Sequence, residues 1–266
     1  MYVSAERLAI ADREVLETFG QTSIAWQAIP HWDTGHPGQN QVTNDVVNGP
    51  GFLNLALDDE PFTATLAQLG SPTPDALLAE VMKKSGDLAA SVDGTVLTAL
   101  AAITPAISLT SIATPDLMNS LIEARARVED AGYRAPSCLI TNIDGLKALN
   151  VFAVGSYPVL DYILSAANIN SLHRATQLAV LKPTAPNKGT DLKKVRMILI
   201  GRRQRIAHGA AADASPGEEP VDLAVSALPG LEVVGENASG GIGMSVQLRY
   251  VTRIKDTTGV VVLQEP

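Results

Sequence analysis

The feature that most constrains the fold is one long amphipathic helix, predicted for residues 73–102. Thr73 is a suitable N-cap, Pro74 suits a first helical turn, and Asp75 carries the charge that a helix N-terminus favours. At 1.5 Å per residue, about 28 residues extend roughly 42 Å. An apolar stripe at helical spacing is formed by Leu77, Leu78, Val81, Met82, Leu88, Ala89, Val92, Val96 and Ala99. A helix of this length crosses a whole domain as a spine, and packing must hold it.

The elements around this helix predict an α+β fold. An amphipathic helix is predicted for residues 4–19, and residues 28–54 are a turn-rich stretch of Pro, Gly, Asn and Asp with only short strand-like pieces. A second helix begins at residues 114–116 and ends near Gly132. Strand patterns dominate the end of the chain, at 195–201, 221–227, 231–235, 243–254 and 259–263. This order lacks the regular βαβ alternation of a nucleotide-binding sheet.

Composition excludes several classes of protein. The 266 residues are 46% hydrophobic and 18% charged, which is typical of a globular chain with a substantial core. The formal charge of −8 argues against a general nucleic-acid-binding surface. No apolar run approaches the ~20 residues needed to cross a bilayer, so no membrane partner is expected. The single Cys138 excludes an internal disulfide and fits a reducing cytoplasm.

The segment HWDTGHPG at 31–38 places His31, Asp33 and His36 close together, which invites comparison with a metal site. The H-x-D-x-x-H spacing matches no familiar zinc or iron motif on a loop, and further ligands would have to come from far away. We therefore expect a turn anchored by Trp32, with no metal, no cofactor and no catalytic residues. A soluble metal-dependent enzyme is the remaining alternative for this segment.

The glycine-rich segment GENASGGIG at 235–243 is the other candidate for a ligand site. A dinucleotide-binding loop requires a strand before the glycines and a helix after them. Here the following residues alternate like a strand, which predicts a hairpin turn.

Charge is distributed unevenly along the chain. No basic side chain lies between Arg13 and Lys83, whereas GRRQRIAHG at 201–209 is a basic cluster. These arginines could neutralise nucleic-acid phosphates, but pairing with carboxylates of a neighbouring subunit is the favoured interpretation. We therefore expect the acidic stretch to find counter-charges on another segment or another subunit. The candidate inter-subunit contact residues are Trp32, Asp58, Asp59, Glu60, Arg202, Arg203 and Arg205.

The segment order resembles a known family of shell proteins. Residues 115–150 (a helix, a glycine turn, a strand and a short helix) and GSYPVLDYIL at 155–164 resemble the apical domain of tailed-phage major capsid proteins of the Hong Kong 97 type, whose close relatives are the encapsulins. The end of the chain, from 221 to 263, resembles the return strands of that domain, with an arginine on the long penultimate strand. The resemblance implies an N-terminal arm at 1–27, an extended loop at 28–70, a peripheral domain with a spine helix at 71–113 and 243–266, and an apical domain at 114–242.

This resemblance implies a major capsid protein and not an enzyme. Identical subunits would form pentamers, usually with hexamers, and close into an icosahedral shell around phage double-stranded DNA held without sequence specificity. Separate scaffold, portal and decoration proteins would be further partners, and the location would be the virion, assembled in the host cytoplasm. The alternative is an encapsulin-type nanocompartment that encloses a cargo enzyme. Some family members crosslink their shells through a lysine of the extended loop, but residues 28–70 contain no lysine, so no such crosslink is expected.

Overall fold

The structure is a computed structural model that describes residues 4–46, 49–133, 137–150, 159–178, 194–202, 219–237 and 240–265. The chain divides into two compact units. The first comprises Met1–Asp93 and Asp222–Arg253, and the second comprises Gly94–Val221 and Ile254–Pro266. Both units combine helices with sheets, which confirms the α+β class.

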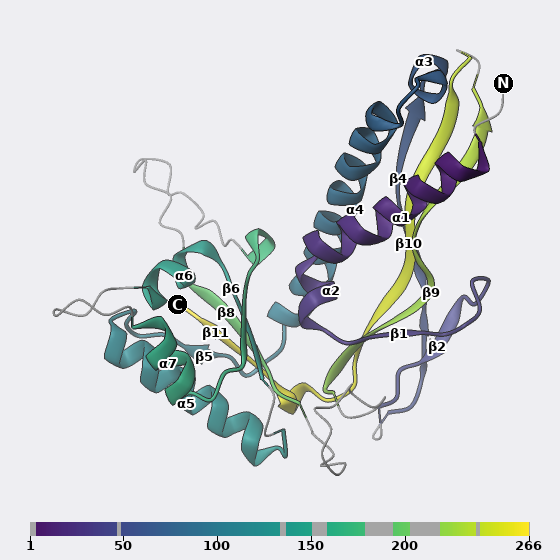
Figure 1. Ribbon diagram of the computed structural model, residues 1–266. Helices are drawn as coiled ribbons and strands as arrows, with labels where there is room; N and C mark the ends of the chain where they lie inside the picture. Colours follow the sequence, from purple (N-terminus) through teal and green to yellow (C-terminus); the bar gives the residue numbers. More distant parts are fainter. Residues whose placement is uncertain are drawn as a thin grey trace, which may run out of the picture. The chain divides into compact units, whose positions relative to one another are not determined.

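The first unit is built on a four-stranded sheet in the order β1-β9-β10-β4 (Figure 1). β10 (Ile242–Ile254) pairs antiparallel with β4 (Ala56–Ala64) along the whole length of β4, which forms one edge of the sheet. At the other edge, β1 (His31–Asp33) pairs parallel with residues 223–225 of β9 (Val221–Glu236). Among the described residues no other strand pairs with the outer edge of β9.

β9 is one continuous strand, so the prediction of two separate strands at 221–227 and 231–235 is wrong. Pro229 and Gly230 suggested a break. The alternation along the strand places the nitrogen of Pro229 on the outer edge, where a missing N–H interrupts no ladder. Beside it, the backbone N–H of Leu231 donates to Asp12 at 2.8 Å.

The glycine-rich segment is a hairpin turn, as predicted. It joins β9 to β10, which are neighbours in the sheet. The N–H of Asn237 donates to the carbonyl of Gly241 at 2.9 Å, and the N–H of Gly241 donates to the side-chain oxygen of Asn237 at 2.9 Å.

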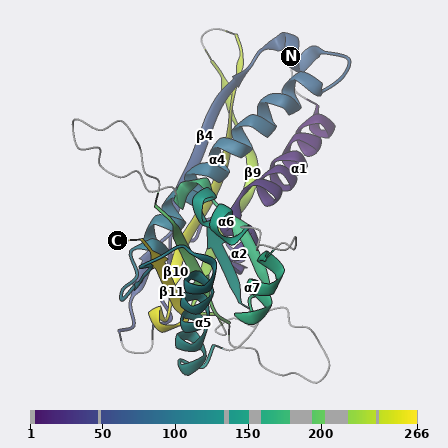
Figure 2. The same ribbon diagram turned by 90° about the vertical axis from the view of Figure 1, so that its left-hand side faces the viewer.

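Two helices run beside these long strands, and the second of them belongs to the first unit only as far as Asp93 (Figures 1 and 2). α1 (Ala5–Thr22) buries Ala11, Val15 and Phe19 completely, so its inner face packs within its own subunit. α4 (Asp75–Ala101) is the long helix predicted from the apolar stripe. Both helix predictions are confirmed.

A buried carboxylate ties the N-terminal segment to α4. Asp93 is 2% exposed and accepts hydrogen bonds from the Ser23 hydroxyl at 2.7 Å and from the backbone N–H groups of Ile24 and Ala25 at 2.9 and 2.8 Å. These donors lie at the start of the short helix α2 (Ile24–Ala28). Because the first N–H groups of a helix have no partner within it, Asp93 acts as a cap supplied by another element.

A second attachment lies at the start of α1. Arg7 donates hydrogen bonds to the backbone carbonyls of Leu69 and Ser71, at the end of α3 (Leu66–Gly70). The last carbonyls of a helix lack partners within it, and a guanidinium satisfies them well. α1 is therefore attached at both ends.

The first unit also contains a two-stranded hairpin within the turn-rich stretch. β2 (Gln41–Thr43) pairs antiparallel with β3 (Phe52–Asn54). Its inner face carries Val42 and Leu53, whereas Phe52 is 74% exposed on the other face. The hairpin packs through a small apolar cluster of Val42, Leu55 and Ala224, with Leu53 and Val251 at its margin.

The second unit is a five-stranded mixed sheet covered by helices. Gly132 ends α5 in the left-handed region (φ 89°), where glycine is the favoured residue. Asn142 caps α6 (Ile143–Leu149) by accepting from the N–H of Gly145 at 2.9 Å. In sheet order the strands are β5 (Ile107–Ser108), β11 (Val260–Gln264), β8 (Arg196–Ile200), β6 (Cys138–Thr141) and β7 (Ser171–Arg174), and the helices are α5 (Thr114–Asp130), α6 (Ile143–Leu149) and α7 (Leu160–Ala166).

The core of the second unit lies between its sheet and its helices. Leu117, Leu121 and Val128 of α5 pack against Leu199 and Leu263 of the sheet, and all five are buried. Of the predicted segment 155–164, residues 155–158 lie outside the described residues. Within the part of the chain that the structure describes, no helix has the length and apolar character needed to span a membrane.

Candidate functional site

The acidic run at 58–60 lies on the edge strand β4 and is tied to α4. Side chains of a strand alternate between its two faces, so Asp58 and Glu60 point the same way. The Ser91 hydroxyl donates to Asp58 at 2.8 Å, and the Lys84 ammonium lies 3.0 Å from Glu60. Glu60 therefore has its counter-charge on another segment of the same chain.

Asp59 points to the opposite face of β4. Its carboxylate accepts from the hydroxyl of Ser245 on β10 at 3.4 Å. The acidic run thus contacts both the helix and the neighbouring strand.

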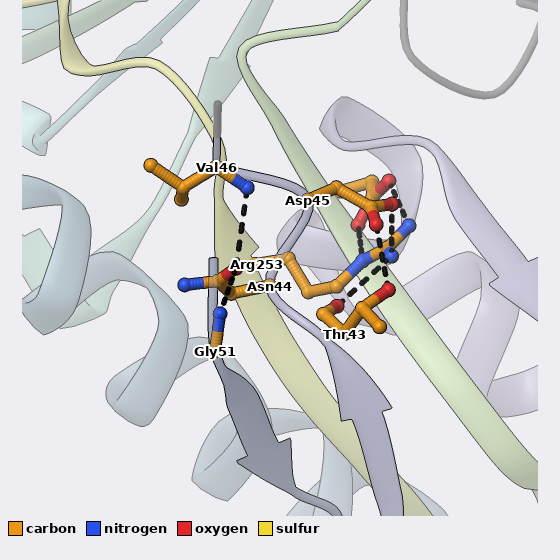
Figure 3. A network of polar contacts seen from close by, with 7 residues as sticks. Thr43, Asn44, Asp45, Val46, Gly51 and Arg253 are labelled. Atoms are coloured by element: carbon orange, nitrogen blue, oxygen red, sulfur yellow. Dashed lines mark hydrogen bonds and ion pairs between the residues drawn. The ribbon is translucent and has the colours of Figure 1, made fainter. Parts of the chain in front are cut away.

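Arg253, near the end of β10, is the centre of a polar cluster that we call the Arg253 cluster: Arg253, Asp222, Asp45 and Trp32. Figure 3 shows Arg253 and Asp45 of this cluster with the adjoining residues of the hairpin. Arg253 Nε and Nη2 donate to the two carboxylate oxygens of Asp222 on β9 at 2.6 and 2.7 Å. Its Nη1 donates to Asp45 Oδ2 at 2.6 Å and to the backbone carbonyl of Thr43 at 3.3 Å. One guanidinium therefore holds the end of β2 against the β9–β10 pair.

The cluster contains a deeply buried cation. The side chain of Arg253 is 2% exposed, that of Asp222 is 5% exposed and that of Asp45 is 49% exposed. Burial alone lowers the pKa of the Arg253 guanidinium, but hydrogen bonds and charges from Asp222 and Asp45 outweigh it, so its pKa is raised. A buried charge needs such partners, because an unpaired ion in the interior is strongly unfavourable.

Trp32 completes the Arg253 cluster from β1. The guanidinium carbon of Arg253 lies 4.9 Å from the centre of the Trp32 ring, within the range of a cation–π contact. The Trp32 side chain is nonetheless 39% exposed. Trp32 is therefore both a partner of Arg253 and an accessible surface residue.

Within HWDTGHPG, residues 31–33 form the strand β1 and only the residues after it form a turn, so the prediction of a turn for the whole segment is wrong for its first three residues. The His31 ring stacks on Trp26 with centroids 3.8 Å apart, and Asp33 accepts from the N–H of Gly35 at 2.8 Å. Gly35 adopts a positive φ of 75°, which glycine tolerates best. Among the described residues, no three His, Cys, Asp or Glu side chains are grouped so that they could hold a metal ion.

The basic cluster is described only in part. Arg202 belongs to the second unit, and its Nε lies 3.3 Å from the carboxylate of Glu219, whose side chain is 4% exposed. Arg203 and Arg205 lie outside the described residues. Arg202 thus has a carboxylate partner within its own subunit.

Sequence reasoning missed Arg253, Asp222 and Asp45 as interacting residues, because they come from three distant parts of the chain. A signal was present in the strands. Asp222 is the only charged residue in the apolar run VDLAV at 221–225. Arg253 is the next-to-last residue of the predicted strand at 243–254. A charge placed among apolar strand residues indicates a buried ion pair, because it is strongly unfavourable without one.

The comparisons with known proteins rest on structure. No protein-family model matches the sequence, and no curated protein sequence matches it either. The structure of a virus-like particle from Pyrococcus furiosus is similar, with a TM-score of 0.68 and 15% identity over 97% of this chain and 98% of that one. The SrpI encapsulin complex from Synechococcus elongatus has a TM-score of 0.56 and 10% identity, over 91% of this chain and 87% of that chain. The mature capsid of bacteriophage PhiM1 has a TM-score of 0.53 and 9% identity, over 91% and 87%.

These similar structures cover both units and include the shells of a phage, a virus-like particle and an encapsulin. Their low sequence identity makes the likeness one of fold. The chain has the capsid fold of the Hong Kong 97 type.

Proposed function

We propose that copies of this chain assemble into a closed icosahedral shell. The observation that supports this most directly is the fold similarity over 97% of the chain to the subunit of a virus-like particle. Assembly of identical subunits into a closed symmetric shell requires complementary surfaces and no catalytic group. We therefore assign the chain a structural role rather than an enzymatic one. Pentamers, with hexamers in larger shells, are the expected building blocks.

The two units fit the parts of such a subunit. We assign the first unit to the N-terminal arm, extended loop and peripheral domain, and the second unit to the apical domain. Compared with the bounds expected from the sequence, this assignment moves residues 94–113 and 254–266 to the apical domain and residues 222–242 to the peripheral domain. The β2–β3 hairpin, with its exposed Phe52, fits the extended loop that reaches a neighbouring subunit. Trp32, the acidic run 58–60 and the basic cluster with Arg202, Arg203 and Arg205 are the proposed contact residues.

For the contents of the shell we propose phage double-stranded DNA, which places the protein in a virion assembled in the host cytoplasm. The formal charge of −8 is compatible with this, because a closed shell retains DNA by enclosure and needs no binding surface. Separate scaffold, portal and decoration proteins would be partners in this case.

A protein-filled compartment is the second candidate. Similarity to an encapsulin complex, at a TM-score of 0.56, favours a shell that encloses a cargo enzyme. In that case the shell would assemble from this chain and its cargo, without packaged nucleic acid.

Negative-stain imaging of the expressed protein tests assembly, and we expect closed particles of uniform diameter. A stable monomer of 27.9 kDa in size-exclusion chromatography would contradict the shell. The ratio of absorbance at 260 and 280 nm, measured on particles from the natural source, then separates the two contents. A high ratio that stays high after nuclease treatment of intact particles supports enclosed DNA. A ratio typical of protein alone supports the compartment that encloses a cargo enzyme.

A further inference from the structure

Arg253 pairs with two carboxylates that differ in burial and belong to different elements. Asp222 lies on β9 and its side chain is 5% exposed, whereas Asp45 follows β2 and its side chain is 49% exposed. The pair with Asp222 uses both carboxylate oxygens, and the pair with Asp45 uses one. The cluster therefore has an inner part within the sheet and an outer part that ends on the hairpin.

The outer part is held in a defined geometry. The Thr43 hydroxyl donates to Asp45 Oδ1 at 2.6 Å, so that Oδ2 faces Arg253 (Figure 3). Asp45 has a positive φ of 51°, a conformation that aspartate tolerates better than most residues. The side chain of Asn44 accepts from the N–H groups of Val46 and Gly51 at 3.2 and 3.0 Å and fixes the adjoining backbone.

The β2–β3 hairpin has few other attachments to the sheet. A two-stranded hairpin is at best marginally stable alone, and this one packs through the small cluster around Val42, Leu55 and Ala224. Among the described residues, two further polar contacts reach it from β10: Arg253 Nη1 donates to the Thr43 carbonyl at 3.3 Å, and Arg249 donates to Asn40 at 2.7 Å. The direction of the hairpin therefore depends strongly on the pair between Asp45 and Arg253.

We infer that Arg253 is a positioning residue that sets the direction of the β2–β3 hairpin through Asp45. The inner pair with Asp222 keeps Arg253 in place, and the outer pair fixes the hairpin relative to β9 and β10. Because salt screens exposed charges more than buried ones, high ionic strength releases the hairpin before it affects the strands. The consequence for assembly rests on the proposed function: a hairpin already set in its binding direction loses less entropy on contact with a neighbour.

The test is hydrogen–deuterium exchange with mass spectrometry on the full chain carrying Asp45→Asn. This change keeps the size and shape of the side chain, removes its charge and replaces one of the two acceptor oxygens by an NH2 donor. We expect amide exchange to accelerate about tenfold in residues 40–46 and 49–55, with no change in β9 and β10. Asp59→Asn is the matched control, because it removes the same charge from β4, and it should leave the hairpin unchanged.

Salt gives a second arm with the same variants. Raising sodium chloride from 0.05 to 1 M should accelerate hairpin exchange in the unmodified chain and in Asp59→Asn, but not further in Asp45→Asn. If Asp45→Asn leaves hairpin exchange unchanged, or accelerates β9 and β10 equally, the positioning role of Arg253 is wrong.

Assembly is measured separately, as the lowest protein concentration at which particles form. We expect Asp45→Asn to raise this concentration several-fold. Asp87→Asn is the control for assembly, because Asp87 is 48% exposed, pairs with a lysine and lies outside the proposed contact residues, and it should leave the concentration unchanged. If exchange changes as expected but the unmodified chain forms no particles, the proposed function fails and the positioning role stands. If particles form and both variants assemble alike, the hairpin direction does not contribute to assembly.

Discussion

At the scale of single residues, burial decides which ionisable groups respond to their surroundings. Cys138 and Arg202 are both in the second unit, where Cys138 begins β6 and Arg202 follows β8. Burial raises the pKa of the Cys138 thiol to about 11, although a hydrogen bond with Ser171 and the charge of Arg202 act in the opposite direction. The thiol is therefore protonated at neutral pH, and its role is packing.

We predict that Cys138 reacts slowly with a disulfide reagent such as dithionitrobenzoate. At pH 8 a thiol of this pKa is roughly a hundredfold less ionised than a free cysteine, so the reaction should slow by about that factor. In guanidinium chloride, one thiol per chain should react at the rate of free cysteine. Rapid reaction of the native protein would contradict the assigned burial.

A second prediction concerns the pair between Arg202 and Glu219. Arg202→Glu places a carboxylate beside Glu219, whose side chain is 4% exposed, so we expect the free energy of unfolding to fall by roughly 2–4 kcal/mol. Thermal unfolding followed by circular dichroism measures this loss.

Arg203→Glu and Arg205→Glu provide the comparison. If these arginines meet acidic groups of a neighbour, their reversal should impair particle formation in electron micrographs more than it lowers the unfolding temperature. Normal particles from both variants would show that the proposed pairing with a neighbour is wrong.

At the scale of elements, attachments between helices and strands come from a few buried polar contacts. Asp93 on α4 accepts three hydrogen bonds from the start of α2, and no cation pairs with it among the described residues. Burial raises the pKa of Asp93, while its hydrogen bonds with Ala25, Ile24 and Ser23 act to lower it. The carboxylate therefore fixes the N-terminal segment at some cost in desolvation.

We predict that Asp93→Ala lowers the free energy of unfolding by roughly 2–4 kcal/mol, because it leaves buried donors without an acceptor. Asp87→Ala on the same helix is the matched control. The Asp87 carboxylate is 48% exposed and lies 3.6 Å from Lys84, so its removal should cost about 0.5 kcal/mol or less. Equal losses in the two variants would contradict the capping role of Asp93.

We also predict that the contribution of Asp93 to the free energy of unfolding depends on pH. Because the pKa of Asp93 is raised in the folded state, the folded chain binds this proton more tightly than the unfolded chain does. The contribution of Asp93 to stability should therefore decrease as the pH rises from its ordinary pKa of 3.8 through the raised value. The stability difference between the unmodified chain and Asp93→Ala, followed by denaturant titration across this range, measures the trend.

Periodicity in the sequence was sufficient to predict the helices but not the full strands. The apolar stripe predicted α4, because long helices repeat the same spacing many times. The prediction for β9 was wrong at Pro229 and Gly230. A proline ends a strand only where its missing N–H would have to pair with a neighbouring strand, and the sequence does not show which strands are neighbours. The Arg253 cluster joins residues 45, 222 and 253, and contacts between segments so far apart leave little trace in local spacing.

At the scale of the whole molecule, the fold is known, and the kind of bond that would join subunits in the proposed shell can be tested. The first lysine is Lys83, so residues 28–70 provide no amine for an isopeptide bond. We predict that assembled particles, boiled in detergent, run as single subunits of 27.9 kDa on denaturing gels. Covalent ladders would contradict this prediction, and mass spectrometry of the bands would identify the linked residues.

The edge strand β4 has a consequence for the proposed shell, in which many copies of the chain would lie close together. An unpaired strand edge is a template on which further chains add without limit, as in fibrils. Within the described residues no strand pairs with the outer edge of β4, which contains three consecutive acidic residues at 58–60 followed by Pro61, a residue with no N–H to donate. Repulsion between like charges and the missing donor both discourage a second copy of β4 from pairing there. In the proposed shell, these features would keep crowded subunits from growing into open-ended sheets and would leave association to surfaces that can close.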